Sequence, residues 1–352
     1  GLGDVYKRQL LNKLLYDLSF LPDIPKGAIW SGNACLDFLD KVKKEKKESS
    51  SEIEQKIKEI LDIGINLCHE GFKLSDELYS SLTKYSSELS GQKSGYAFYR
   101  NSEPFSPDSI IRRPQLGKTL ELLKDNGLDY FYNSDIANEI TKSTNGFITK
   151  DDLSNYKPAW REPLHINIYG YDGWTSPPST QGYLTLSALK GFEIIDDKED
   201  YLHTLIESYR IFAADRDNIT YDYMGQDDNF NGTDNAYIKD KVKQFNSSTS
   251  GKFNSPQPHG GGTAYMNAVD ESGLGVSLIQ SNFHGIGSRI GVGSYGFFLH
   301  NRGCGFNLIE NHPNMIHPRK KPLHTLSPTC LLYTSPSPRD VEESRMPSSA
   351  WK

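Results

Sequence analysis

The residue of this chain best suited to chemistry is a threonine that directly follows a run of glycines. Thr263 comes after Gly260, Gly261 and Gly262. A threonine hydroxyl is a poor nucleophile at its own pKa and needs an adjacent base. Breaking the Gly262 to Thr263 bond would create an α-amino group, with an ordinary pKa of about 7.7 to 8.0, that can act as this base. Most glycine runs followed by threonine are ordinary loops, and this pattern alone is a weak signal. It supports the hypothesis that the chain cleaves itself between Gly262 and Thr263, with Thr263 as the nucleophile.

The segments around Thr263 are expected to place it at the start of a strand, behind a flexible tether. Residues 246–262 are rich in Ser, Gly and Pro, a composition typical of an exposed, mobile connector. Residues 263–270 and 274–281 read as two strands, joined by the turn residues Glu271, Ser272 and Gly273.

Elements before the connector are mainly helical in pattern. Apolar residues at helical spacing predict an amphipathic helix over 51–68, and Ser75 is a candidate cap for a second helix. A third helix is expected to follow Pro114 and to end at Asn126-Gly127, and a long amphipathic helix is expected from Leu202 to around residues 215–217. Alternation over 164–171 predicts a strand, and the prolines within 174–182 predict a break in regular structure. Helices grouped before the connector and strands after it favour a layered α/β protein over a doubly wound one.

Several strings support the hypothesis about Thr263. They are GTAYMNAVDESGLGVSLIQSNFHGIGS from Gly262, then HNRGCGF and HPNMIHPRKKPLHTLSP, with RRPQLGKTLELL, FITKDDLSNYKPAWREPL, SPPSTQGYLTLSALKGFE and LHTLIESYRIFAADRD upstream. In this order they resemble the γ-glutamyltranspeptidase family, in the branch of the glutathione hydrolase-like proenzymes and oxamate amidohydrolase. The resemblance covers residues 28–329, and agreement of this many strings in order is specific.

The resemblance implies an N-terminal nucleophile hydrolase of the α/β (α+β) class, with an αββα four-layer sandwich. Such a protein is made as an inactive precursor, a zymogen, that cuts itself into two subunits, which stay together as a heterodimer without a covalent link. The implied activity is that of a γ-glutamyltransferase or glutathione hydrolase, which forms an acyl-enzyme on threonine and needs no cofactor. By this resemblance Thr263 is the nucleophile and Ser281 supplies a second hydroxyl that bonds it. The positions implied for substrate binding are Asn282, Asn301, Arg302, His324 and Thr325.

The same resemblance sets the expected boundaries. Residues 1–9 and 330–352 are expected to be non-native ends, 10–262 to be the large-subunit-like region, and 263–329 to begin the small subunit. The family's oxyanion-hole Gly-Gly pair and its carboxylate-binding arginine have no match, so we expect this chain to be truncated at both ends and inactive in turnover.

Departures from the family bear on the substrate. The family's acidic pair is replaced by Cys304 and Gly305, whereas Arg302 offers a planar fork of donors suited to a carboxylate or an oxamate-like group. Hydrolysis of a related small amide is therefore an alternative to γ-glutamyl cleavage of glutathione-like substrates. An alternative of another class is a sandwich protein that never processes itself and has a binding role. Arg289 stands where this branch often has glycine.

Composition argues against other classes of function. The formal net charge of −6 does not favour nucleic acid as a partner. The four cysteines form no CxxC pair, and His300, His312 and His317 lack metal-ligand spacing, so no metal site is expected. No apolar run has the length of a membrane span, and we expect a soluble chain. Its compartment stays open among the cytoplasm, the periplasm and secretion.

Overall fold

A computed structural model describes residues 29–31, 50–156, 159–197, 199–224, 226, 229–253, 263–269 and 275–333. The chain divides into two compact units. The first unit contains Gly1–Trp160 and Pro258–Cys304, and the second contains Arg161–Gln257 and Gly305–Lys352. Among the described residues, no helix is both long and apolar enough to cross a membrane.

The helices of the first unit begin and end where local sequence signals predict. The helix expected over 51–68 is α3 (Ser50–Glu70). α4 (Asp76–Lys84) is capped by Ser75, whose hydroxyl accepts from the Leu78 N–H, and α6 (Pro114–Asn126) ends at Gly127. Among its described residues this unit also contains α5 (Ser86–Leu89), η1 (Lys93–Gly95), α7 (Tyr130–Asn133), α8 (Asp135–Ser143) and α9 (Lys150–Asn155). Two short antiparallel pairs lie among them: β2 (Phe72–Lys73) with β5 (Ile110–Ile111), and β3 (Tyr99–Arg100) with β4 (Glu103–Pro104).

The predicted hairpin after the connector is confirmed. β9 (Ala264–Val269) pairs antiparallel with β10 (Gly275–Gln280), and the register places Ala264 opposite Gln280. The predicted turn residues between the strands lie outside the described residues. The chain after β10 packs into the helical part of this unit, because Ile286 joins the core of Leu74, Leu82 and Leu89. Farther along, Val292 packs against Ile136 and Ile140 of α8.

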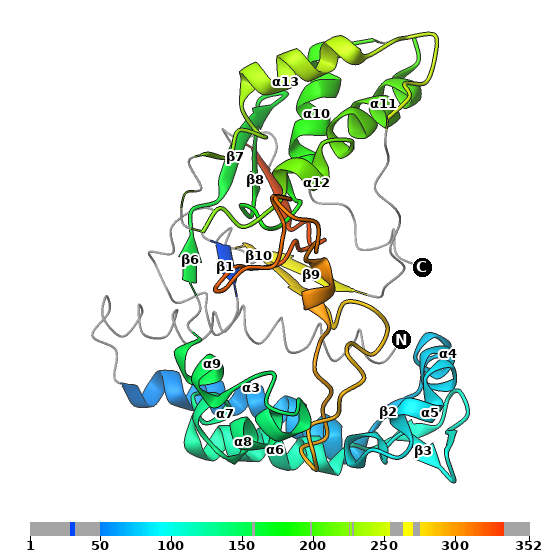
Figure 1. The fold of residues 1–352 in the computed structure, drawn as a ribbon, viewed down its shortest axis with the longest axis vertical. Helices are drawn as coiled ribbons and strands as arrows, with labels where there is room; N and C mark the ends of the chain where they lie inside the picture. Colours follow the sequence, from blue (N-terminus) through cyan, green and yellow to red (C-terminus); the bar gives the residue numbers. More distant parts are fainter. Residues whose placement is uncertain are drawn as a thin grey trace, which may run out of the picture. The chain divides into compact units, whose positions relative to one another are not determined.

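The second unit is built on a three-stranded antiparallel sheet. Its order is β11 (Thr329–Tyr333), β8 (Tyr171–Thr175) and β7 (Leu164–Ile168), so β11 crosses the boundary expected at residue 330. Its helices are α10 (Tyr183–Ile195), α11 (Tyr201–Ala213), α12 (Arg216–Ile219), α13 (Asn235–Lys241) and η3 (Val242–Gln244), and α10 and α11 lie side by side (Figure 1). In the first unit a further pair joins β1 (Ile29–Ser31) to β6 (Ala159–Arg161), whose last residue begins the second unit.

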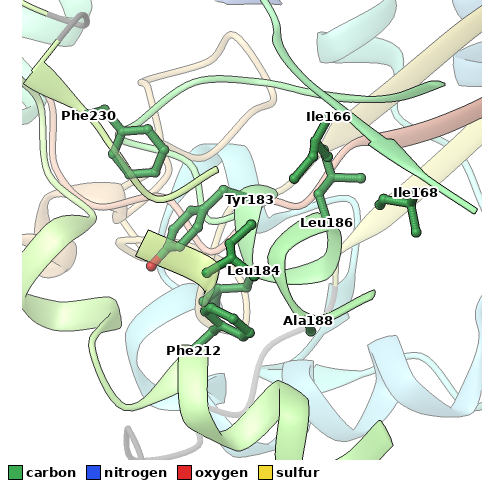
Figure 2. Packing of buried hydrophobic residues seen from close by; sticks show 9 residues of the cluster. Ile166, Ile168, Tyr183, Leu184, Leu186, Ala188, Phe212 and Phe230 are labelled. Carbon is green, nitrogen blue, oxygen red and sulfur yellow. The ribbon is translucent and has the colours of Figure 1, made fainter. Parts of the chain in front are cut away.

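The core of the second unit forms between β7 and the helices. Ile166 and Ile168 of β7 belong to one buried cluster with Tyr183, Leu184, Leu186 and Ala188 of α10, together with Phe212 and Phe230 (Figure 2). The Tyr183 ring meets the Phe230 ring edge-on, with 5.0 Å between the centroids. This packing fixes α10 against the sheet.

Three expectations about the elements are wrong. The strand predicted over 164–171 is confirmed by β7, but the break predicted over 174–182 begins too early, because Trp174 and Thr175 belong to β8 and pair with β7 and β11. The helix predicted from Leu202 exists as α11 but ends at Ala213, before the expected 215–217. Leu202 and Ile206 are exposed, and the buried residues are Thr204, Glu207, Ser208, Ile211 and Phe212. Strands are not confined to the part after the connector, since β2 to β8 precede it.

The first residues of the predicted connector contact α11. The Glu207 carboxylate, buried at 3% exposure, accepts a hydrogen bond from the Gly251 N–H at 2.8 Å, and Arg210 Nη2 donates to Gly251 O at 2.9 Å. His203 Nε2 lies 2.9 Å from Asn246 O. Residues 246–253 are therefore held by side chains that the composition of the connector does not reveal.

Candidate active site

The hairpin of β9 and β10 brings Thr263 and Ser281 together. Thr263 is the residue before β9 and Ser281 the residue after β10, so the register that pairs Ala264 with Gln280 places both at the open end of the hairpin. Thr263 Oγ1 donates to Ser281 Oγ at 3.0 Å. Ser281 Oγ also accepts from the Phe283 N–H at 2.9 Å, which orients the serine. Thr263 is exposed, and Gly262, the other residue of the expected cleavage site, lies outside the described residues.

Ser281→Ala is expected to slow self-cleavage about tenfold, because it removes one hydrogen bond of about 1.4 kcal/mol that aims the Thr263 hydroxyl. The measurement is the rate at which intact chain is converted to fragments at neutral pH. Ser277 is the matched control, since it lies on β10 and its hydroxyl donates to the Tyr265 hydroxyl at 3.2 Å, away from Thr263. Equal rates for Ser281→Ala and Ser277→Ala would contradict the role of Ser281.

Asn282 and Asn301 lie next to each other although they are far apart in sequence. The Asn301 N–H donates to Asn282 O at 3.2 Å, and the Asn301 side chain accepts from the His284 N–H at 3.0 Å through Oδ1. The segment between them folds back on itself, because Leu299 O accepts from the Ser288 N–H at 2.8 Å. The loop after Ser281 therefore returns two of the predicted substrate-binding residues to the region of the hairpin's open end.

Arg302 is a buried cation beside this loop. It begins η4 (Arg302–Gly305), is 9% exposed, and stacks on Phe283 with its guanidinium carbon 3.4 Å from the ring centroid. Burial lowers the pKa of Arg302 to about 10, so the group remains charged at neutral pH. A desolvated guanidinium interacts more strongly with a carboxylate than an exposed one does.

His324 and Thr325 lie in the second unit, whereas the other predicted site residues lie in the first. The His324 N–H donates to Ser179 O at 2.8 Å, and Ser179 Oγ lies 3.4 Å from His324 Nδ1. Thr325 O accepts from Gln181 Nε2 at 3.5 Å. His324 and Thr325 therefore lie beside the segment that joins β8 to α10 in the second unit.

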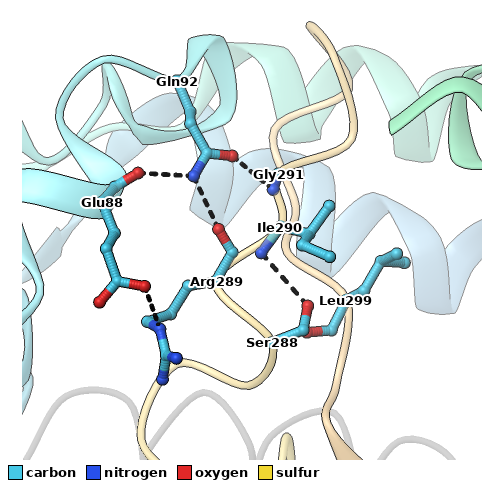
Figure 3. Close-up of polar contacts among 7 residues, drawn as sticks. All are labelled: Glu88, Gln92, Ser288, Arg289, Ile290, Gly291 and Leu299. Atoms are coloured by element: carbon cyan, nitrogen blue, oxygen red, sulfur yellow. Dashed lines mark hydrogen bonds and ion pairs between the residues drawn. The ribbon is translucent and has the colours of Figure 1, made fainter. Parts of the chain in front are cut away.

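Arg289 makes contacts that explain how an arginine is held at a position suited to glycine. Its φ is 62°, a left-handed conformation that costs a residue with a Cβ about 1 kcal/mol or more. Its Nε donates to Glu88 Oε2 at 2.6 Å (Figure 3). Its guanidinium carbon lies 4.8 Å from the centroid of the Tyr85 ring. The replacement of glycine by arginine marks this position in the sequence. The sequence does not predict that Arg289 contacts Glu88 on α5 and Tyr85 before that helix.

Arg289→Ala is expected to lower the free energy of unfolding by about 1 kcal/mol more than Arg289→Gly does. Both changes remove the Glu88 and Tyr85 contacts, but only alanine keeps the backbone strain at φ 62°. Chemical denaturation of the two variants checks the difference. Equal stabilities would show that strain at this position is negligible.

The three histidines considered as metal ligands contact the backbone. His300 Nδ1 accepts from the Arg302 N–H at 3.2 Å, His312 Nδ1 accepts from the Asn314 N–H at 3.0 Å, and His317 Nδ1 lies 2.9 Å from Pro318 O. In the part of the chain that the structure describes, no three His, Cys, Asp or Glu side chains are grouped to hold a metal ion.

Comparison with known proteins gives the family. The family model of gamma-glutamyltranspeptidase matches residues 54–341. The chain is 30% identical over 244 residues to the glutathione hydrolase-like YwrD proenzyme of Bacillus subtilis, covering 66% of this chain and 46% of that protein. It is 31% identical over 233 residues to the oxamate amidohydrolase proenzyme of Klebsiella pneumoniae, covering 63% of this chain and 43% of that protein.

A solved structure of a related fold also matches this chain. The crystal structure of cephalosporin acylase from Bacillus halodurans matches with a TM-score of 0.68 and 25% identity, over 79% of this chain and 54% of that one. The chain spans about half the length of the curated relatives it matches. The gamma-glutamyltranspeptidase model matches most of this chain, and helices and strands are mixed as in its structural relative. This chain therefore belongs to the gamma-glutamyltranspeptidase family.

Proposed function

We propose that this chain belongs to an amidohydrolase precursor of the N-terminal nucleophile type, which cleaves itself between Gly262 and Thr263. The observation that carries the proposal is the 3.0 Å hydrogen bond from Thr263 Oγ1 to Ser281 Oγ. It holds the proton of the threonine hydroxyl and leaves the oxygen's lone pairs for attack. The proposal includes the four-layer αββα sandwich, with two subunits that stay together after cleavage.

Self-cleavage proceeds in two balanced steps. Thr263 Oγ1 attacks the carbonyl carbon of Gly262, the hydroxyl proton passes to the Thr263 nitrogen, the amide C–N bond breaks, and the acyl group is left on oxygen as an ester. Water then hydrolyses the ester, which leaves a carboxylate on Gly262 and a free α-amino group on Thr263. That amine has an ordinary pKa of about 7.7 to 8.0, so a useful fraction is neutral and can take the hydroxyl proton.

In turnover the freed threonine attacks a substrate amide. The α-amino group takes the proton from Oγ1, the amide carbonyl becomes an ester of Thr263, and the leaving amine receives the proton. Water or an acceptor amine then releases the acyl group. Arg302, a buried cation that stays charged, suits a substrate with a carboxylate near the scissile amide.

The leading substrate class is the γ-glutamyl amide of glutathione-like peptides, in keeping with the glutathione hydrolase-like relative. A small amide such as oxamate is the second candidate, favoured by Arg302 and by the relative named oxamate amidohydrolase. Cys304 and Gly305 replace the acidic pair that would bind a glutamyl amino group, which favours this second candidate.

Mass spectrometry of a processed full-length version of the protein, after brief incubation with each substrate, tests the proposal. We expect an acyl adduct on the fragment that begins with Thr263, and none on Thr263→Ala. An adduct with glutathione but not with oxamate supports the γ-glutamyl class, and the reverse supports the small amide. A chain that forms neither adduct and never cleaves itself would support a sandwich protein with a binding role.

A further inference from the structure

A small irregular hairpin separates the two asparagines of the candidate site. Within residues 288–299 the Leu299 N–H donates to Ile290 O and the Val292 N–H donates to Phe297 O, both at 3.0 Å. Beyond the base of this 288–299 hairpin, Asn301 bonds Asn282. Any shift of the hairpin therefore moves Asn301, and Arg302 next to it.

The Gln92 carboxamide binds the backbone of this hairpin as a neighbouring strand would. Its Oε1 accepts from the Gly291 N–H at 2.6 Å, and its Nε2 donates to Arg289 O at 2.7 Å (Figure 3). The same Nε2 donates to Glu88 O at 2.7 Å, which fixes the direction of the amide. One side chain thus satisfies a donor and an acceptor two residues apart, as a peptide unit does in a sheet.

Other contacts hold the hairpin without Gln92. Arg113 Nη2 donates to Gly296 O, and the Thr119 hydroxyl donates to Tyr295 O at 2.8 Å, so α6 and the residue before it bind the tip. Val292 is fully buried against α8. Loss of the Gln92 contacts would therefore loosen the backbone of Arg289 and Gly291 at the base of the hairpin, where the Arg289 side chain still pairs with Glu88, while the tip stays attached.

We propose that Gln92 is a positioning residue for the candidate active site: its carboxamide sets the base of the 288–299 hairpin and, through it, Asn301 and Arg302 relative to Thr263 and Ser281. This inference rests on the proposed function. It assigns this role to a side chain that lies far from Thr263 in sequence and acts on the site through the 288–299 hairpin.

Gln92→Met and Gln92→Glu form the test. Methionine keeps the length of the side chain but neither hydrogen bond, and we expect self-cleavage to slow by about 10- to 100-fold, the effect of a misplacement of about 1 Å. In Gln92→Glu, the protonated carboxyl group can still donate to Arg289 O and accept from the Gly291 N–H. The ionised carboxylate would instead face the carbonyl oxygens of Glu88 and Arg289.

The quantity compared is the self-cleavage rate of each variant divided by that of the unmodified chain at the same pH. For Gln92→Glu this ratio is expected to lie within about threefold of one at pH 5 and to fall toward the Gln92→Met ratio by pH 8. The charged side chains that face this position are Glu88 and Arg289, which pair with each other at 2.6 Å. Ser187→Ala is the matched control, because the Ser187 hydroxyl donates to Gly232 O in the second unit at 2.7 Å.

The outcomes separate the two claims. A slow Gln92→Met, an unchanged Ser187→Ala and a pH-dependent Gln92→Glu support the inference. Gln92→Met cleaving at the unmodified rate would overturn it and leave the proposed function standing. Gln92→Glu equally slow at every pH would also overturn it, because the effect would then be a general loss of packing. An unmodified chain that never cleaves itself overturns the proposed function, and the inference with it.

Discussion

Thr263→Ala is expected to leave the chain in one piece, with self-cleavage slowed by about 1000-fold or more. Alanine removes the attacking oxygen. The Ser281 hydroxyl accepts from Thr263 but cannot replace it, because the acyl group shifts from nitrogen to oxygen within the residue that follows the scissile bond. Thr263→Ser keeps a hydroxyl at the same carbon and is expected to cleave. Intact-mass analysis over a time course at neutral pH measures both.

The serine variant is the control for this experiment, since it changes the same position and keeps the reactive group. Near-ultraviolet circular dichroism of both variants checks that each is folded. Cleavage of Thr263→Ala at the rate of the unmodified chain would place the nucleophile at another residue.

Gly287→Ala is expected to lower the free energy of unfolding by about 2 to 4 kcal/mol and to slow self-cleavage by about 100-fold. Gly287 has a φ of 72°, and a Cβ at this position would lie 2.3 Å from Leu299 O and 3.0 Å from His300 Cα. Both atoms belong to the backbone and cannot turn away as a side chain can. The 288–299 hairpin would have to open at its base, beside Asn301.

Gly127→Ala separates the clash from the backbone strain. Gly127 ends α6 with a φ of 87°, and a Cβ there would meet no atom within 4 Å. Its expected cost is about 1 kcal/mol, with an unchanged rate of self-cleavage. Chemical denaturation and fragment analysis of both variants give the comparison, and equal costs would mean that the hairpin base accepts a side chain freely.

Local signals were enough to predict the elements whose ends are capped locally. The Ser75 cap, Pro114 and Gly127 mark ends of α4 and α6, because each acts within one turn of its own helix. The buried face of α11 could not be predicted in this way. It combines the apolar Ile211 and Phe212 with polar residues, because Glu207 binds Gly251 and Ser208 donates to Ala188 O, and both of these partners come from other segments.

The pairing of Thr263 with Ser281 was predictable from the sequence, whereas the position of Asn301 was not. Thr263 and Ser281 flank two strands joined by a turn, so the alternation of a hairpin brings them together once the register is right. Asn301 reaches Asn282 only through the irregular 288–299 hairpin. The contacts of Gln92 join residues almost two hundred positions apart, and no local pattern in the sequence predicts a pairing of that kind.

The most direct test of the central claim is the mass of the fragments that the unmodified chain forms on incubation at neutral pH. Self-cleavage predicts two fragments that meet between Gly262 and Thr263, the second beginning with a free threonine amine. A chain that stays intact, or one cut at a different bond while the Gly262 to Thr263 bond survives, would contradict it.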